Sequence, residues 1–397
     1  MLDPTFLDLG VSAPVVGALA RRDIVAPFPI QALVLPDAMA GRDVLARSRT
    51  GSGKTLAFAI PIVERTDPAA SRPSALVLVP TRELASQVAG DFADIARAQG
   101  LLVAAAYGGV GLAAQAKAAA RAHVLIATPG RLEDLAQRGL VRLDGVRILI
   151  LDEADRMLDM GFQPQVDRIV RRIPKVRQTM FFSATLDGEV GVLARAYTRD
   201  ARIHEVESRM QTVDEVEHRF VPVTDSGKVM ALADLIKAEQ GTALVFVRTK
   251  RGADRLVTKL KAFGVPAVAM HGDMQQRARE HALARFESGR VRTMVATDVA
   301  ARGLDLDRIS HVINFDPPAD HKDYVHRVGR TARAGRSGIG VTFVLPDQQS
   351  DVGRVATRLK LQEEFQQEGM KVAPPRLVYA SKRGRRSQLA GRRGRRF

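Results

Sequence analysis

The sequence contains no cysteine and no tryptophan, and only four of its 397 residues are tyrosine. Without cysteine the chain has neither disulfides nor thiolate metal sites, and its eight histidines show no paired spacing typical of metal ligands. No apolar run approaches the roughly 20 residues that a membrane-spanning helix needs. The first ten residues, MLDPTFLDLG, are acidic, whereas a secretory signal would be basic. These absences predict a soluble, cytoplasmic protein with no membrane partner.

Positive charge is the main excess in the composition. The chain has 60 lysines and arginines against 44 acidic residues, a formal net charge of +16, which favours a polyanionic partner. Residues 371–397 carry ten of these positive charges and no acid, so the rest of the chain carries only +6. Because the last part of this segment, KRGRRSQLAGRRGRRF, is rich in Arg and Gly and has little to bury, we predict a disordered tail. Contact with nucleic acid is the preferred interpretation of the tail, and a merely solubilising tail is the alternative.

The length of the chain is too great for one hydrophobic core and suits two domains. Short apolar runs, each followed by a polar or glycine cluster, alternate with segments of helix length through both halves. This alternation predicts α/β domains with mostly parallel sheets flanked by helices. The runs lie at residues 75–80, 123–130, 147–155, 179–185, 242–249, 265–273, 292–298, 311–318 and 339–346.

The segment between the two halves, from His204 to Asp214, is polar and has neither helical nor strand periodicity, so we interpret it as a linker. Two other segments, Ala113–Ala122 and Asp351–Gly369, have strong helix formers or apolar residues at helical spacing and are predicted to be packing helices. The predicted organisation is a first domain at residues 1–204, a linker at 205–214, a second domain at 215–370 and the basic tail at 371–397.

The most informative segment is RILILDEAD at Arg147–Asp155, where a buried-looking apolar run ends in three carboxylates. Acids at the carboxyl end of a buried strand face the crevice in which α/β sheets bind ligands, so we expect a metal there. Upstream, Thr50–Thr55 reads TGSGKT, a glycine-rich turn whose backbone N–H groups can hold phosphates. Lys54 would reach the terminal phosphates, and Thr55 would supply an oxygen to Mg²⁺. Together these segments predict a nucleoside triphosphatase whose metal arrives with its nucleotide.

Ten segments, in their order along the chain, resemble the motifs of DEAD-box ATP-dependent RNA helicases. They are TGSGKT (50–55), PTRELA (80–85), GG (108–109), TPGR (128–131), DEAD (152–155), SAT (183–185), LVFVRTK (244–250), HGDMQQRAR (271–279), ATDVAARGLD (296–305) and HRVGRTARAGR (326–336). The resemblance covers nearly all of residues 1–345, and its specificity comes from the order of the segments. The stretch DRMLDMGF at 155–162 is most similar to the RhlE-like bacterial subgroup.

This resemblance implies two tandem RecA-like domains, with ATP and Mg²⁺ in the cleft between them and RNA lying across both domains on another face. Asp152 and Thr55 would hold Mg²⁺, and Glu153 would orient or deprotonate the attacking water. Arg327 and Arg330 would reach the γ-phosphate from the second domain. The implied catalytic residues are Lys54, Glu153, Arg327 and Arg330. The implied nucleotide-binding residues are Gln31, Ser48, Thr50, Gly51, Ser52, Gly53, Lys54, Thr55, Gly303 and Asp305.

By the same resemblance, hydrogen bonds would couple the ATP site to the RNA site. The residues implied in this coupling are Asp155, Ser183, Thr185 and His326. Those implied in touching the RNA backbone are Pro80, Thr81, Arg82, Gly109, Thr128, Arg131 and Thr297. Small residues and backbone amides suit contacts to phosphate and sugar, which position a strand without reading its bases. Because aromatic stacking platforms are scarce, RNA recognition is predicted to be largely independent of sequence.

One element departs from the family's pattern. The adenine-reading segment usually has glycine followed by an aromatic residue, then proline, serine or threonine, one further residue, isoleucine and glutamine, whereas Asp23–Gln31 reads DIVAPFPIQ. Asp23 replaces the glycine, Ile24 replaces the stacking ring and Phe28 replaces the hydroxyl residue. Gln31 alone can still make two hydrogen bonds to adenine, so ATP remains the predicted nucleotide.

The function that the sequence predicts is local separation of short RNA duplexes, with ATP binding closing the domains on one strand and hydrolysis reopening them. Two alternatives are open. One is an RNA clamp or assembly scaffold that uses ATP only to lock onto RNA. The other is a DNA translocase of the same superfamily, against which the PTRELA, SAT and DEAD segments argue.

Overall fold

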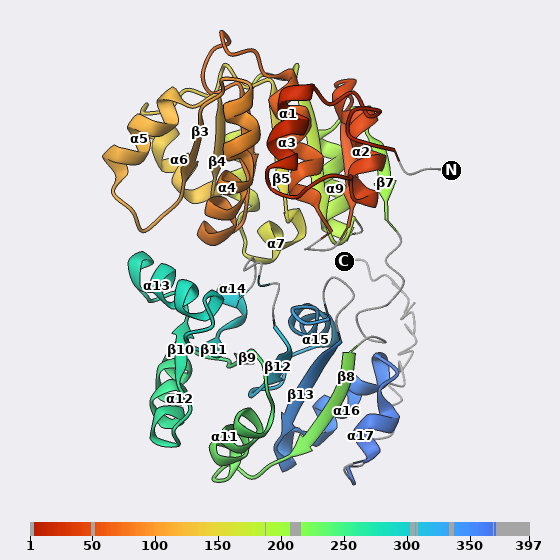
Figure 1. Ribbon diagram of the computed structural model, residues 1–397, viewed down its shortest axis with the longest axis vertical. Coiled ribbons are helices and arrows are strands. Elements are labelled where there is room, and N and C mark those ends of the chain that lie inside the picture. Colours follow the sequence, from red (N-terminus) through yellow and green to blue (C-terminus); the bar gives the residue numbers. More distant parts are fainter. Residues whose placement is uncertain are drawn as a thin grey trace, which may run out of the picture.

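The structure is a computed structural model with two α/β bodies stacked one on the other (Figure 1). It describes residues 4–48, 52–186, 188–206, 216–301, 306, 309–332, 337–367 and 369–370. Four residues predicted to bind the nucleotide, namely Thr50, Gly51, Gly303 and Asp305, lie outside the described residues, as does the predicted tail. Within the described part, no helix is both long and apolar enough to cross a membrane.

The N-terminal body is built on a sheet of seven strands in the order β3-β4-β2-β5-β6-β1-β7. All neighbouring pairs are parallel, so the carboxyl ends of the strands lie at one edge of the sheet. The strands are β1 (Val44–Arg47), β2 (Ala75–Leu78), β3 (Val103–Ala106), β4 (Val124–Ala127), β5 (Ile148–Asp152), β6 (Gln178–Ser183) and β7 (Arg202–Glu205).

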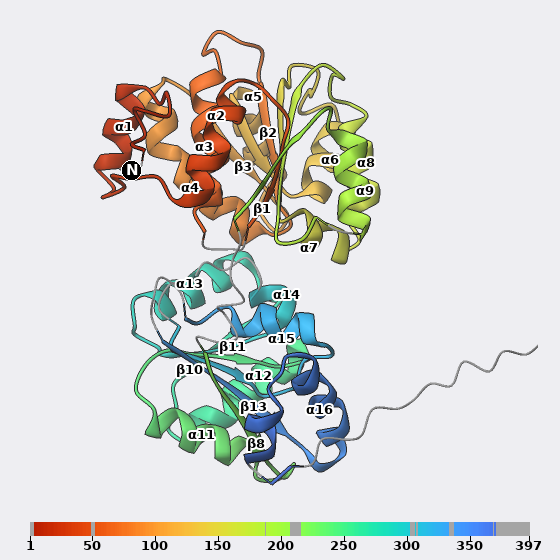
Figure 2. The same cartoon turned by 90° about the vertical axis from the view of Figure 1, so that its right-hand side faces the viewer.

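Helices cover both faces of this sheet (Figure 2). Alternate strand residues point to opposite faces: Ile150 and Phe182 pack with α1–α4, whereas Leu149 and Phe181 pack with α5–α9. Burial on both faces explains why the central strands are continuous apolar runs. The helices are α1 (Ala13–Ala20), α2 (Pro29–Met39), α3 (Lys54–Arg65), α4 (Arg82–Ala98), α5 (Leu112–Arg121), α6 (Pro129–Gln137), α7 (Ala154–Asp159), α8 (Gln163–Val170) and α9 (Gly188–Tyr197).

The C-terminal body repeats this plan with six parallel strands in the order β10-β11-β9-β12-β13-β8. Its strands are β8 (Val216–Pro222), β9 (Ala243–Phe246), β10 (Ala267–Met270), β11 (Thr293–Ala296), β12 (His311–Asn314) and β13 (Gly338–Val344). Its helices are α11 (Lys228–Ala238), α12 (Lys250–Ala262), α13 (Gln276–Glu287), α14 (Asp298–Ala301), α15 (His321–Val328), η1 (Pro346–Gln348), α16 (Gln349–Arg358) and α17 (Gln362–Gln367). The predicted fold class, two α/β bodies with parallel sheets flanked by helices, is confirmed.

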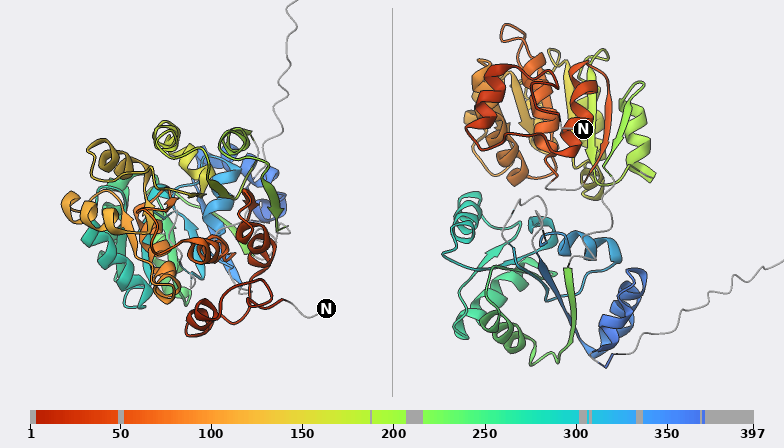
Figure 3. Two further views of the ribbon diagram at one scale, coloured as in Figure 1. Left: turned by 90° about the horizontal axis from the view of Figure 1, so that it is seen from above. Right: turned by 45° about the vertical axis from the view of Figure 1, so that its right-hand side comes forward.

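Two predicted boundaries differ from the structure. β7 extends to Glu205 because it pairs in parallel with β1 at the edge of the sheet, so it takes the first residue of the predicted linker. The predicted helix 351–369 is divided into α16 and α17, because Lys360 between them adopts a left-handed φ of +61°. The two bodies meet where α7 lies opposite α14 and α4 lies opposite α13. The same stacking is seen from two further directions in Figure 3.

Candidate active site

The phosphate-loop segment leads from β1 into α3. α3 begins at Lys54, and Gly53 before it has a φ of +83°, which glycine adopts at little cost. Lys54 is buried, and its Nζ donates to the Ser48 carbonyl at 3.1 Å. The Ser52 hydroxyl donates to the Ser48 hydroxyl at 3.0 Å, and Thr55 follows in the first turn of α3. The N-terminus of a 12-residue helix and a buried ammonium therefore lie together, an arrangement that favours anions.

β5 brings the acidic cluster to the same edge of the sheet. It ends at the buried Asp152, whose Oδ1 accepts a hydrogen bond from the Glu153 N–H at 2.9 Å. Glu153 has a left-handed φ of +50°, which turns the chain into α7. Burial raises the pKa of Asp152 to about 6, although the charge of Lys54 opposes this rise. A cation bound beside Asp152 would therefore favour the charged form of this buried carboxylate.

Glu153 forms a buried ion pair with Arg156, which lies one turn later on α7. Arg156 Nη1 donates to Glu153 Oε2 at 2.7 Å, and each side chain is only 8% exposed. Burial alone would raise the pKa of Glu153. The positive charges of Arg156, Lys54 and Arg330 outweigh burial and hold this pKa below its usual value. Glu153 is therefore a desolvated carboxylate that stays ionised and can orient a water molecule.

A cavity of about 60 Å³ lies beside Glu153, between the two bodies. The N-terminal body lines it with Lys54, Glu153, Asp155, Arg156, Asp159 and Ala184, and the C-terminal body lines it with His326 and Arg330. Arg330 comes two residues after the end of α15 and is buried. Residues far apart in the sequence therefore meet in one place. Of the four predicted catalytic residues, Lys54 and Glu153 line the cavity from the N-terminal body, Arg330 lines it from the C-terminal body, and Arg327 is not among its lining residues.

Arg327 lies differently from Arg330. Its Nε and Nη2 donate to the two carboxylate oxygens of Asp298 at 2.6 and 2.7 Å, and its Nη1 donates to Asn314 Oδ1 at 3.0 Å and to the Asp316 carbonyl at 2.7 Å. The guanidinium also lies over the Phe246 ring at 5.0 Å. All these contacts are within the C-terminal body, so Arg327 would have to leave them to reach a phosphate.

The residues predicted to couple the two sites form a connected group in the N-terminal body. Asp155 Oδ2 accepts from the Ala184 N–H at 3.2 Å, and Ser183 Oγ accepts from the N–H groups of Asp155 and Thr185 at 3.4 and 3.3 Å. The end of β6 is thereby attached to the start of α7. His326, from the C-terminal body, lines the same cavity as Asp155.

The predicted RNA-binding residues lie around two hollows that also involve both bodies. The first, of about 380 Å³, is lined by Pro80, Thr81, Arg82, Thr128 and Arg131 together with Gly272, Arg279, Val299 and Ala300. The second, of about 730 Å³, is lined by Arg82 and Gly109 together with residues 273–277 and Glu280. Thr297 is buried at the end of β11, and its N–H donates to the Met270 carbonyl at 3.2 Å. The structure therefore brings the predicted RNA residues of the N-terminal body to one surface.

Arg82 and Gly109 depend on each other. Gly109 has a φ of +84°, which glycine adopts at little cost, and a Cβ atom there would lie 2.2 Å from Arg82 Nη1, so the Arg82 guanidinium lies directly against this glycine. Arg131 is held nearby, with its Nη1 and Nη2 both donating to the Val110 carbonyl at 3.1 Å. Two predicted phosphate-binding arginines are thus placed beside the same glycine turn.

Two contacts between the bodies were not predicted from the sequence. Arg279 Nη2 pairs with Glu83 Oε1 at 2.8 Å, and both side chains are buried. Arg156 Nη2 donates to the Val299 carbonyl at 3.4 Å, which connects the partner of Glu153 to α14. The resemblance picks out the segments that contain or adjoin Arg156, Glu83 and Arg279. It does not give the partners of these residues, because those partners belong to the opposite body.

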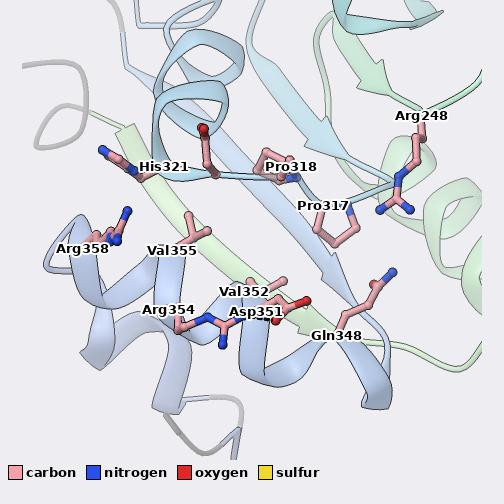
Figure 4. Close-up of a pocket in the computed structure, with 12 residues that line it drawn as sticks. Arg248, Pro317, Pro318, His321, Gln348, Asp351, Val352, Arg354, Val355 and Arg358 are labelled. Atoms are coloured by element: carbon pink, nitrogen blue, oxygen red, sulfur yellow. Dashed lines mark hydrogen bonds and ion pairs between the residues drawn. The ribbon is translucent and has the colours of Figure 1, made fainter. Parts of the chain in front are cut away.

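Another hollow, of about 300 Å³, lies within the C-terminal body between residues 317–321 and α16 (Figure 4). Arg248, His321, Arg354 and Arg358 line it with Pro317 and Val355. It contains none of the predicted site residues, and Asp320 within it already caps the N-terminus of α15 by accepting from the Asp323 N–H at 2.9 Å. The candidate active site is therefore the cavity between the bodies.

Comparison with known proteins agrees with this geometry. The sequence model of the DEAD/DEAH box helicase family matches residues 28–191, and that of the helicase conserved C-terminal domain matches residues 227–335. The chain is 39% identical over 362 residues to the DEAD-box ATP-dependent RNA helicase CshA of Geobacillus kaustophilus, covering 91% of this chain and 78% of that protein. It is also 39% identical over 341 residues to the ATP-dependent RNA helicase DbpA of Escherichia coli, covering 85% of this chain and 74% of that protein.

The fold has solved counterparts as well. The structure resembles Dbp5 of S. cerevisiae bound to RNA and ADP BeF3, with a TM-score of 0.80 and 29% sequence identity. The match covers 91% of this chain and 94% of the Dbp5 chain. The likeness extends over both bodies, so it includes the way in which they are joined.

Proposed function

The chain belongs to the DEAD-box family of ATP-dependent RNA helicases, and on this premise we propose that it separates short RNA duplexes locally, through ATP binding and hydrolysis in the cavity between its two domains. ATP with Mg²⁺ is its cofactor and RNA is its partner. The observation that carries the proposal is the meeting of Lys54 and Glu153 with Arg330 at one cavity lined by both bodies. Hydrolysis then requires domain closure, and closure is the movement that acts on RNA.

The contacts in the cavity support a division of roles among the catalytic residues. Lys54 and the N-terminus of α3 would bind the phosphates, Glu153 would orient the attacking water, and Arg330 would stabilise the charge that develops on the γ-phosphate. The buried setting strengthens each of these interactions, because few water molecules screen the charges. Arg327 is better placed to hold α14 and β12 in position, through Asp298 and Asn314, than to reach the nucleotide.

The residues present fit a magnesium ion that is delivered with the nucleotide. Asp152 and Thr55 offer the oxygen donors that Mg²⁺ prefers, and the raised pKa of Asp152 indicates a carboxylate whose burial a cation would compensate. In nucleotide sites Mg²⁺ takes one or two protein oxygens and otherwise phosphate and water ligands, and it neutralises charge on the phosphates. Asp152 and Thr55 would hold the ion, and Lys54 would bind the phosphates beside it.

RNA would lie across the two hollows that flank the nucleotide cavity. Arg82 and Arg131 supply guanidinium donors for phosphates, and Thr81 and Thr128 supply hydroxyls and backbone groups. Among the described residues, Phe162 is the one aromatic side chain that lines the 380 Å³ hollow and Tyr107 the one that lines the 730 Å³ hollow, so stacking platforms are few there. This supports recognition of the RNA backbone with little dependence on sequence.

ATPase rates measured with and without single-stranded nucleic acid test the proposal. We expect single-stranded RNA to raise the rate and single-stranded DNA of the same sequence to have little effect, because 2′-OH contacts distinguish the two. Displacement of a strand from a short RNA duplex should require ATP, and a clamp or scaffold would hydrolyse ATP without displacing the strand. Equal stimulation by DNA would favour the translocase alternative, and an ATPase indifferent to RNA would overturn the proposal.

The predicted tail lies outside the described residues, and its role is proposed from charge alone. Residues 382–396 hold eight positive charges, and each phosphate neutralised on single-stranded RNA contributes about −0.7 to the slope of log K against log salt. If roughly half of these charges engage at once, deletion of residues 375–397 should flatten the slope by about 3. ATP turnover at saturating RNA should survive the deletion. Parallel salt titrations of the full-length and truncated chains would instead show that the tail takes no part in RNA binding.

Three finer assignments belong to the proposal. Membership of the RhlE-like bacterial subgroup is supported by the stretch DRMLDMGF at 155–162, within which Arg156 makes the ion pair with Glu153. A cytoplasmic location is supported by RNA as the partner. The division into domains at 1–204 and 215–370 is supported by the two separate sheets.

A further inference from the structure

Arg156 lies on α7, between the nucleotide cavity and the C-terminal body. Its side chain is only 8% exposed. Nη1 donates to Glu153 Oε2 at 2.7 Å, and Nη2 donates to the Val299 carbonyl at 3.4 Å. Because Val299 belongs to α14, a single side chain joins the predicted catalytic carboxylate to the opposite body (Figure 1).

α14 is also part of the surface at which RNA is proposed to bind. Val299 and Ala300 line the 380 Å³ hollow. The helix follows directly on Thr297, one of the residues implied in touching RNA, and the N–H groups of Ala300 and Ala301 donate to the Thr297 carbonyl at 3.0 and 2.9 Å. An RNA strand in this hollow therefore lies beside the helix whose carbonyl group Arg156 binds.

The two bonds of Arg156 differ in what they require. The bond to Glu153 lies within the N-terminal body, so it does not depend on where the other body stands. α14 is held in the C-terminal body by Asp298, which accepts from Arg327 at 2.6 and 2.7 Å. The Val299 carbonyl consequently moves with that body, and its bond to Arg156 is made only when the bodies meet.

We propose that Arg156 is a positioning residue that couples bound RNA to the catalytic carboxylate. When RNA brings α14 against α7, the Val299 carbonyl fixes the guanidinium, and the guanidinium holds Glu153 in the pose that orients the attacking water. When the bodies separate, the guanidinium loses one of its two anchors and Glu153 can turn together with it. The inference rests on the proposed function and adds a residue to the coupling set that the family resemblance implies.

This coupling needs an arginine. A guanidinium carries five N–H donors in a planar fork, so its separate nitrogens can serve two acceptors in a fixed geometry. Lysine has one ammonium group on a flexible stem. Arg156→Lys therefore keeps a positive charge beside Glu153 but does not hold Glu153 and the Val299 carbonyl in the same arrangement.

ATP hydrolysis by full-length Arg156→Lys, measured with and without saturating single-stranded RNA, tests the coupling. Both rates should fall, and the rate with RNA should fall about tenfold further, the lower end for a hydrogen bond from a charged donor. KM for ATP should change by less than about twofold, because the bond acts in the closed state and not in nucleotide binding. An equal fall in both rates would reduce Arg156 to an ion-pair partner of Glu153 and overturn the inference. An original protein that RNA does not stimulate would instead overturn the proposed function.

The affinity of the closed complex for RNA is an independent measurement. With a non-hydrolysable ATP analogue, Arg156→Lys should bind single-stranded RNA about tenfold more weakly than the original protein, because the bond to Val299 is made only on closure. Without nucleotide, the two proteins should bind RNA equally. Arg168→Lys is the matched control, since Arg168 on α8 pairs with Glu133 on α6 within the N-terminal body, and it should alter neither affinity. Equal RNA affinity of Arg156→Lys and the original protein in the presence of the analogue would contradict the role of the Val299 bond.

Discussion

Replacement of Glu153 by glutamine should abolish ATP turnover and leave the binding of ATP and RNA intact. Glutamine has the same shape, and its amide oxygen can still accept the hydrogen bond that Arg156 donates to Glu153 at 2.7 Å. It cannot act as a base, and positioned acid–base groups contribute about 10²- to 10⁴-fold to rates. We therefore expect kcat to fall by a factor in this range, and complexes with RNA that depend on ATP should persist because hydrolysis no longer opens the domains.

The same measurement on Glu133→Gln supplies a matched control. Glu133 is also a glutamate of the N-terminal body that pairs with an arginine, Arg168, but it lies on α6 away from the cavity. Its substitution should leave kcat unchanged. Hydrolysis at the original rate in Glu153→Gln, with the control behaving as expected, would remove Glu153 from the catalytic role.

Most of the strands that the sequence predicted are buried on both faces, and the edge strand β10 is the exception. β5 and β6 are buried along their whole length because helices cover both sides, so their apolar runs ILIL and MFF are visible without the structure. Three strands at the sheet edges were not predicted: β3 reads VAAA and is only partly buried, β7 reads RIHE, and β8 alternates between buried and less buried residues. Their place is decided by pairing with a neighbouring strand, which composition does not reveal.

The sequence predicts those residues of the candidate site that lie within short motifs at the ends of strands. Lys54 and Glu153 follow β1 and β5, and parallel strands end at one edge, so local motifs predict that these residues lie together. Arg156 and Arg279 were not predictable, because their partners Val299 and Glu83 belong to the opposite body. The motif that contains Arg327 and Arg330 likewise does not predict which arginine lines the cavity. Arg327 is held away from it by its bond to Asp298, a residue outside that motif.

Arg330→Ala should lower kcat by about 10³-fold or more, the effect typical of an arginine that contacts the transferred phosphate. Arg330 is buried at the cavity with Lys54 and Glu153, although it belongs to the other body. Because it acts only when the domains are closed, ATP affinity measured without RNA should change little. Arg330→Lys keeps the positive charge but loses the planar fork of donors, so it should restore only part of the rate.

Arg327→Ala provides the contrast that makes the assignment of Arg330 testable. Arg327 bonds to Asp298 and Asn314 within the C-terminal body, so its removal should lower the free energy of unfolding by about 3 kcal/mol, the scale of a broken buried ion pair. Thermal unfolding and single-turnover hydrolysis should therefore separate the two variants: Arg330→Ala should lose the chemical step out of proportion to any change in Tm, whereas Arg327→Ala should lose Tm. If Arg330→Ala retained more than a tenth of kcat, the charge that stabilises the γ-phosphate would have to come from another residue. If Arg327→Ala kept its Tm but lost the chemical step, Arg327 would have to leave Asp298 and Asn314 during the reaction and bind a phosphate of the nucleotide.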